Sequence, residues 1–180
     1  MKPIEILKEE HQVILGVIQV IDAIVSKIRK GEKIDNNDLR DIVDFIKTFA
    51  DRCHHRKEED LLFKYMIDAG VPKEGGPIEV MLSEHEMGRR FVKIMEDSLN
   101  RQSVDYSKFV EGASGYSGLL NEHIYKEDNI LYRMAEMHID DESMKRLLEE
   151  FERVEKFEIG EEVHKRYHKL SENLRKKYLA

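Results

Sequence analysis

A ten-residue phrase occurs twice in this chain, as "HHRKEEDLLF" at 54–63 and as "HIYKEDNILY" at 123–132. Four positions are identical, namely the first His, the Lys, the first Glu and one Leu. In each copy a His stands four residues before a Glu, and a helix places such residues on one face, one turn apart. The repeat therefore predicts two similar helical halves, each carrying a His/Glu pair.

A second motif extends the repeat toward the N-terminus. The dipeptide Glu-His stands on the helix that precedes each phrase, and it ends at His11 in the first half and at His85 in the second. His85 follows His11 by 74 residues, and His123 follows His54 by 69. Each half thus supplies one His from its first helix and a His/Glu pair from its second.

Apolar residues at steps of three and four predict four long helices. The first runs from Pro3 to Gly31, and the others cover 39–65, 77–99 and 109–134. No stretch has the alternating pattern of a strand. Long helices with short connections predict an all-α, up-down-up-down four-helix bundle over residues 1–138. Residues 139–180 are predicted to form a C-terminal helical extension packed on the same domain.

Composition limits the classes of protein that this chain can be. A net charge of −7 argues against nucleic-acid binding, which favours a basic face. By inspection, no run approaches the roughly 18 apolar residues of a membrane span, and "MKPIEILKEEHQ" is too charged for a secretory signal. The single cysteine, Cys53, excludes an internal disulfide and suits a reducing compartment. We expect a cytoplasmic protein that binds neither nucleic acid nor membrane.

Six polar residues continue the apolar stripes and should face the bundle centre. They are His11, His54, Glu58, His85, His123 and Glu127. A single His on an apolar stripe is usually a hydrogen-bonded core residue, but burying six such groups is costly without compensation. Two divalent or trivalent metal ions would compensate, with imidazoles as terminal ligands and glutamates as bridges.

The doublet at 54–55 requires a choice. His54 continues the inward row, whereas His55 has charged neighbours one turn away and is replaced by Ile124 in the second copy. We therefore expect His54 to bind metal and His55 to support the site from outside or to lie at the surface. Cys53 is expected to be a small buried apolar residue, with participation in redox chemistry as the alternative.

The four motifs "EEHQVIL", "HHRKEEDLLF", "SEHEMGR" and "HIYKEDNILY" together resemble the hemerythrin-like family, also called the HHE cation-binding domain. The resemblance covers residues 1 to about 138. It implies a four-helix bundle around a non-haem di-iron centre that is bridged by carboxylates and an oxo or hydroxo group. Transferred by position, the implied iron ligands are His11, His54, Glu58, His85, His123 and Glu127.

Two features depart from the oxygen-carrying members of that family. Those proteins have His-x-x-x-His on the third helix, whereas here Arg89 follows His85. They also place an Asp five residues after the fourth-helix His, and this chain has both Glu127 at four and Asp128 at five. The first copy of the phrase favours Glu127. The missing His argues against simple oxygen carriage and favours branches linked to sensing, iron handling or iron–sulfur repair.

The extension contains two further histidines in "GEEVHKRYHKL", His164 and His168. They form either a surface pair on an amphipathic helix or a contribution to the metal site. In the second case the extension covers the open end of the bundle, and His168 supplies a seventh ligand in place of Arg89.

The leading functional prediction is a di-iron protein that binds or senses O2, NO or peroxide, or that handles iron, because His with carboxylate suits iron. The enzymatic alternative is a peroxidase-like protein or an iron–sulfur repair factor. The third alternative is a structural site for zinc or mixed metals without redox chemistry. A sensor role would require an unseen protein partner, and a homodimer is the other assembly considered.

Overall fold

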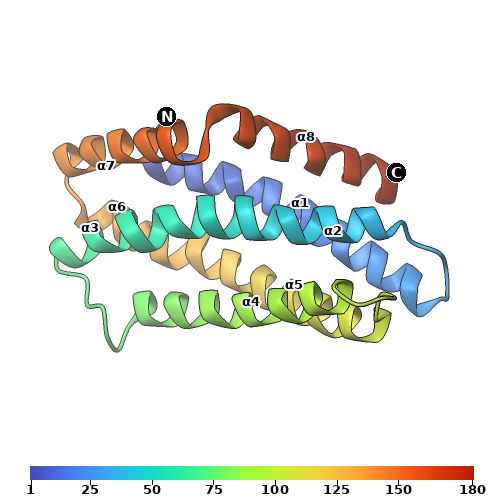
Figure 1. The fold of residues 1–180 in the computed structure, drawn as a ribbon. Coiled ribbons are helices and arrows are strands. Elements are labelled where there is room, and N and C mark those ends of the chain that lie inside the picture. The colour runs from blue at the N-terminus through green and yellow to red at the C-terminus, as the bar shows by residue number, and fades with distance from the viewer.

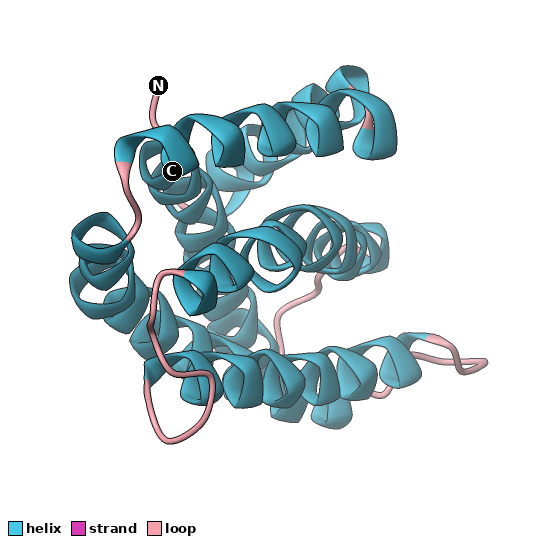
Figure 2. Ribbon diagram, turned by 90° about the vertical axis from the view of Figure 1, so that its left-hand side faces the viewer, coloured by secondary structure: helices cyan, strands magenta, loops and turns pink.

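The computed structural model describes residues 1–180, which form helices and no strand, so the prediction of an all-α bundle is confirmed (Figure 2). Two bundle helices are regular, α1 (Pro3–Arg29) and α4 (Pro77–Leu99). The other two are composite. The second consists of α2 (Asn36–Phe45), η1 (Ile46–His55), η2 (Lys57–Leu62) and α3 (Phe63–Asp68), and the fourth of α5 (Tyr106–Lys126), η3 (Glu127–Leu131) and α6 (Tyr132–His138). The four helices alternate in direction along the bundle (Figure 1).

Helix starts and stops follow from local chemistry. The side chains of Asp35, Asp105 and Asp140 each accept a hydrogen bond from a backbone N–H in the first turn of the helix that follows. Pro3 occupies the first turn of α1, where a missing N–H costs nothing. Gly31 ends α1 with a φ of +75°, a conformation that glycine adopts without strain.

Both composite helices have π-helical winding in the repeated phrase, and this winding begins at Ile46 in the second helix and at Glu127 in the fourth. The N–H of Phe63 donates to the carbonyl of Glu58, and the N–H of Tyr132 donates to the carbonyl of Glu127, in each case five residues back. These two bonds occupy equivalent places in the two halves. Short π segments are rare and are frequent at functional sites.

The metal-binding motifs lie in a polar layer between two apolar clusters. On α1, Leu7 belongs to one cluster and Ile14 to the other, and His11 lies between them. On α4, Met81 and Val92 flank the other Glu-His motif in the same way. The polar layer is therefore closed by hydrocarbon on both sides along the bundle axis.

The extension returns along the α1 and α2 side of the bundle. It consists of α7 (Asp141–Arg153), η4 (Val154–Ile159) and α8 (Glu161–Tyr178) (Figure 1). Phe151 packs into one apolar cluster and Tyr167 into the other. The chain turns into α8 at Gly160, whose φ is +91°. The extension thus covers one long side of the bundle rather than its end.

By length and composition alone, α1 could cross a membrane. The expectation that no segment approaches such a span is therefore wrong for α1. Half of its most apolar window is buried inside the bundle, and the core helix of a soluble protein passes the same test, so one such helix is weak support for a membrane span.

Candidate metal centre

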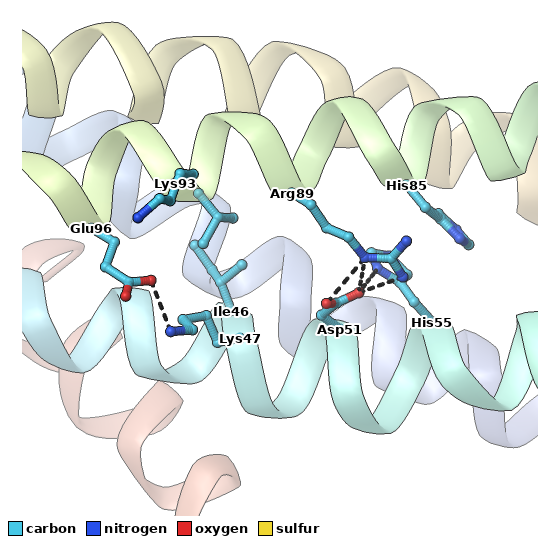
Figure 3. Close-up of a pocket in the computed structure, with 9 residues that line it drawn as sticks. Ile46, Lys47, Asp51, His55, His85, Arg89, Lys93 and Glu96 are labelled. Carbon is cyan, nitrogen blue, oxygen red and sulfur yellow. Dashed lines mark hydrogen bonds and ion pairs between the residues drawn. The ribbon is translucent and has the colours of Figure 1, made fainter.

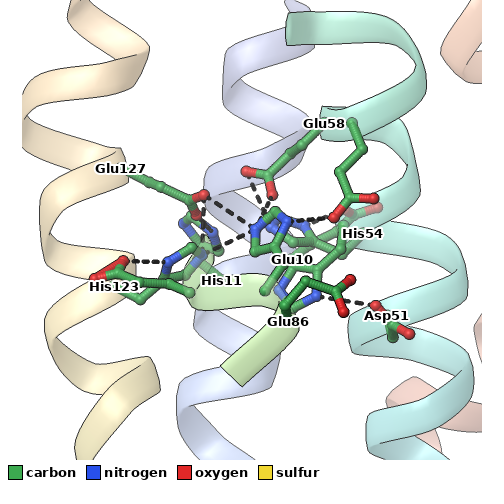
Figure 4. Close-up of polar contacts among 12 residues, drawn as sticks. Glu10, His11, Asp51, His54, Glu58, Glu86, His123 and Glu127 are labelled. Atoms are coloured by element: carbon green, nitrogen blue, oxygen red, sulfur yellow. Dashed lines mark hydrogen bonds and ion pairs between the residues drawn. The ribbon is translucent and has the colours of Figure 1, made fainter. Parts of the chain in front are cut away.

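The polar layer contains two groups of potential metal ligands that share one residue, Glu58 (Figure 4). The first group is His11, His54, Glu58 and Glu127, and the second is His55, Glu58, His85 and His123. Within each group the ligand atoms lie within 4.8 Å of one another. All seven residues are buried. The structure thus brings together the six residues singled out from the sequence and adds His55.

Each glutamate lies between imidazoles of different helices. The two carboxylate oxygens of Glu127 are 3.1 Å from His11 Nε2 and 3.0 Å from His123 Nε2. Glu58 lies 3.3 Å from His85 Nε2 through one oxygen and 3.6 Å from His54 Nε2 through the other. Tyr132 additionally donates to Glu58 at 2.5 Å. Both carboxylates therefore offer their oxygens to imidazoles of two different helices.

Several buried atoms at the centre have no partner in hydrogen-bond geometry, although imidazole nitrogens lie close to the Glu127 oxygens. They are His54 Nε2, one oxygen of Glu58 and both oxygens of Glu127. Buried polar atoms are normally hydrogen-bonded, because leaving them unpaired costs free energy. Imidazole nitrogen and carboxylate oxygen are common metal ligands. The residues present therefore fit a pair of metal ions.

His55 is buried in the cluster, which differs from the supporting or surface position expected for it. Its ring stacks on that of His85 with centroids 4.0 Å apart. The cause is the winding of η1, where the N–H of Arg56 bonds to the carbonyl of Asp51 five residues back. Because a π turn holds more residues, neighbouring side chains are separated by a smaller angle, and His54 and His55 both face inward.

A carboxylate orients every imidazole of the cluster through its Nδ1–H. The pairs are His11 with Asp128 at 2.7 Å, His54 with Glu10 at 2.8 Å, His85 with Glu59 at 2.7 Å, His123 with Glu84 at 2.9 Å and His55 with Asp51 at 3.3 Å. Such partners fix the tautomer and direct Nε2 toward a metal. These orienting carboxylates were not predicted from the sequence as a set. Their sequence signal is the repeated Glu-His dipeptide, together with the acidic residue that follows Glu58 and Glu127.

The Lys of the repeated phrase also has an equivalent role in both halves. Lys57 contacts Glu10, and Lys126 contacts Glu84, so each lysine neutralises the carboxylate that orients a cluster imidazole. The two sites differ in exposure, since Lys57 is fully buried whereas the Lys126 side chain is 35% exposed. Lys57 lies beneath the extension, 5.9 Å from the centre of the Phe151 ring.

Mutual contacts shift the pKa values of the buried groups. Burial and the Glu127 carboxylate act to raise the pKa of Glu58, but the nearby imidazoles outweigh both and lower it to about 2. Burial acts to lower the pKa of His54, but Glu58 and Glu10 raise it to about 9. Burial and His85 together lower the pKa of His55 to about 3. Without metal, the centre therefore pairs carboxylates with protonated imidazoles, and His55 is neutral.

Metal binding should consequently release protons. At pH 7 the imidazole of His54 is protonated because its pKa is about 9, and it must lose that proton before it binds metal. We expect the apparent affinity for Zn²⁺, used as a redox-silent probe, to rise with pH between 7 and 9. Calorimetric titration in two buffers of different ionisation enthalpy measures the released protons. Identical heats in both buffers would contradict the prediction.

The structure places His168 outside the cluster. Its ring contacts those of Phe49 and His164, at centroid distances of 5.4 and 4.6 Å. The reason is that α8 runs along the side of the bundle, whereas the expected seventh ligand required it to cover the end. His55, and not His168, is the additional imidazole near Arg89. Arg89 itself donates hydrogen bonds to Asp51 and Glu59, the carboxylates that orient His55 and His85.

Comparison with known families agrees with this geometry. The model of the hemerythrin HHE cation-binding domain matches residues 2–135. The chain belongs to this family. No curated protein and no solved structure showed significant similarity to the chain. The HHE match spans the four bundle helices up to α6 and therefore contains every residue of the cluster, while the extension lies beyond it. The predicted family is confirmed, and binding of a cation by the clustered His and Glu residues is supported.

Proposed function

We propose that this HHE domain holds two non-haem iron ions and binds or senses O2, NO or peroxide. The supporting observation is the set of unpartnered buried Nε2 and carboxylate atoms, arranged in two groups that share Glu58. Glu58 and Glu127 would bridge the ions, and the five imidazoles would be terminal ligands. Iron at such a site would supply redox chemistry and open coordination positions for small ligands.

The choice of iron follows from the ligands. Each of the two groups combines imidazoles with at least one carboxylate, a combination found in non-haem iron sites that keep open positions. Neither contains a thiolate, since Cys53 lies in a separate group with Glu10 and His164. The surrounding residues would hold the imidazoles in fixed orientations, and apolar clusters close the buried centre on both sides along the bundle axis.

A binding or sensing role is favoured over thiol-assisted peroxidase chemistry. Cys53 is the single cysteine, and its side chain is buried. Burial and the nearby Glu10 carboxylate raise the pKa of the thiol to about 12. Since the thiolate is the reactive form, Cys53 is a poor nucleophile or resolving group at neutral pH.

Reaction of the reduced protein with small ligands tests this proposal. The protein would be loaded anaerobically with Fe²⁺, freed of unbound iron, and mixed in a stopped-flow spectrometer with O2 or NO. We expect an optical change with at least one of the two ligands, with a protein-dependent rate. A protein that retains iron but gives no change with either ligand would contradict ligand binding. Zinc without iron in protein isolated from cells grown without added metal would favour a structural site.

A further inference from the structure

The two ligand groups differ in their number of imidazoles. Glu58 and Glu127 each direct one oxygen toward an imidazole of the first group and the other oxygen toward an imidazole of the second. The imidazoles are His11 and His54 in the first group, and His55, His85 and His123 in the second. In the second group the rings of His55 and His85 are stacked, beside Arg89 and Asp51 (Figure 3). The first group therefore offers fewer protein ligands, and an ion there would keep more room for a small molecule.

The hydroxyl of Tyr132 lies beside this first group. Tyr132 is fully buried, and its hydroxyl donates to Oε1 of Glu58 at 2.5 Å. The hydroxyl oxygen is also 3.3 Å from Nε2 of His11. The same Glu58 oxygen is 3.6 Å from Nε2 of His54. The hydroxyl is thus adjacent to potential ligand atoms of the position that has two imidazoles.

Position 132 also distinguishes the two copies of the repeated phrase, because the equivalent residue in the first copy is Phe63. The ring of Tyr132 lies nearly parallel to that of His11, with centroids 5.4 Å apart. The ring of Phe63 lies in the same way against His85, with centroids 6.1 Å apart. An aromatic ring without a hydroxyl therefore meets the packing requirement. Since burying a hydroxyl costs free energy unless it is hydrogen-bonded, the hydroxyl at position 132 indicates a role beyond packing.

A phenolic hydroxyl donates one hydrogen bond, and rotation about its C–O bond redirects the proton without moving the ring. Metal binding would engage Nε2 of His11 and the carboxylate of Glu58, the two groups that the hydroxyl contacts. We infer that Tyr132 then donates a hydrogen bond to the small ligand at the position formed by His11 and His54. Because hydrogen bonds to charged acceptors are stronger, Tyr132 favours ligands that carry negative charge over neutral NO. This inference rests on the proposed di-iron function and names the residue that discriminates among its ligands.

Azide, an anionic acceptor, tests this hydrogen bond. Tyr132→Phe removes only the hydroxyl, and Phe63 shows that phenylalanine fits against an imidazole of the cluster. We expect the dissociation constant of azide from the oxidised, iron-loaded protein to rise about tenfold or more, the effect of losing one hydrogen bond to a charged acceptor. Binding of NO to the Fe²⁺-loaded protein should change little, because neutral NO is a weak acceptor. Equal weakening of both ligands would show that Tyr132 acts by positioning Glu58, and it would overturn direct donation.

Tyr65→Phe is the matched control. The Tyr65 hydroxyl donates to Glu150 at 2.7 Å, a contact between α3 and α7, and its side chain packs against an apolar cluster rather than in the polar layer. The variant makes the same chemical change away from the centre, so it should bind azide with the wild-type dissociation constant. A loss equal to that of Tyr132→Phe would show that the effect is not specific to the hydroxyl at the centre, and it would overturn the inference.

The infrared stretching band of bound azide reports the hydrogen bond directly. The band should shift between H2O and D2O in the wild type, because the hydroxyl proton exchanges, and it should not shift in Tyr132→Phe. No shift in the wild type, which needs no variant, or the same shift in both proteins would overturn the inference. Iron content separates the two levels of the proposal, since wild-type protein that retains no iron would overturn the proposed function itself. Tyr132→Phe protein that retains iron and binds azide as the wild type does would overturn the hydrogen bond alone.

Discussion

Replacing Lys57 with Met should destabilise the metal-free protein by about 3–5 kcal/mol, the cost of breaking a buried ion pair by removing one partner. The Lys57 side chain is fully buried, and its ammonium contacts the carboxylate of Glu10, which is itself only 3% exposed. Methionine keeps the apolar stem of lysine. The loss of unfolding free energy therefore measures the effect of removing the positive charge beside the Glu10 carboxylate. Chemical denaturation of chelator-treated protein measures the free energy of unfolding.

The repeat provides a matched control for this substitution. Lys126 occupies the equivalent position in the second half and contacts Glu84 in the equivalent way, but its side chain is 35% exposed. Because solvent screens such a pair, Lys126→Met should cost no more than about 1 kcal/mol. Equal losses in the two variants would show that burial beneath the extension does not strengthen the dependence on Lys57.

Iron-loaded protein should unfold at a clearly higher temperature than metal-free protein. A ligand that binds only the folded state stabilises it by about 2.7 kcal/mol at one hundred times its dissociation constant. For a chain of this length each kcal/mol raises the melting temperature by about 2–4 °C, so the expected increase is roughly 5–11 °C for one site. Differential scanning calorimetry under anaerobic conditions measures it.

Glu58→Ala should abolish most of that increase, because Glu58 belongs to both ligand groups. Each variant is compared with its own metal-free form, so the direct effect of the substitution on stability cancels. His138→Ala is the control, since His138 is exposed and donates only to the carbonyl of Met134. We expect His138→Ala to keep the wild-type increase. If iron raised the melting temperature of Glu58→Ala as much as that of the wild type, the stabilising metal would not be bound by Glu58.

The sequence predicted the bundle because its helical information is periodic and local. Steps of three and four between apolar residues define the face of each helix that is buried, and short connections leave an antiparallel arrangement as the simplest solution. The same periodicity predicted the inward direction of His11, His54 and Glu58. Two further repeats in the sequence carry structural information, namely the Glu-His dipeptide and the repeated Lys. Together they supply an orienting carboxylate and its counter-ion in both halves.

The burial of His55 could not be derived in this way. With α-helical spacing, only one of His54 and His55 can face the bundle centre. Ile124, the equivalent of His55 in the second copy, favoured His54 as that residue. The structure instead uses π winding over η1, which turns His54 and His55 together toward the centre. Such winding is rare and changes the angle between successive side chains, so a row drawn with α-helical spacing does not predict it.

The side on which the extension packs does have a signature in the repeat. Where the first half has Phe45, Phe49 and Cys53, all buried, the second half has Ser114, Gly118 and Glu122, of which the last two are exposed. An apolar outer face needs a cover, and a polar one does not. A residue-by-residue comparison of the two halves therefore indicates that a cover lies along α2 and η1, and in the structure His168 of the extension contacts Phe49 there.

We propose that the two halves of the repeat enclose a dinuclear metal centre, and the number of metal ions per chain tests this proposal most directly. Protein would be loaded anaerobically with Fe²⁺, passed through a desalting column, and analysed for metal and protein by mass spectrometry. We expect two iron ions per chain in the wild type and in His138→Ala, and a loss of iron from Glu58→Ala. Fewer than two ions in the wild type, or two ions retained by Glu58→Ala, would contradict it.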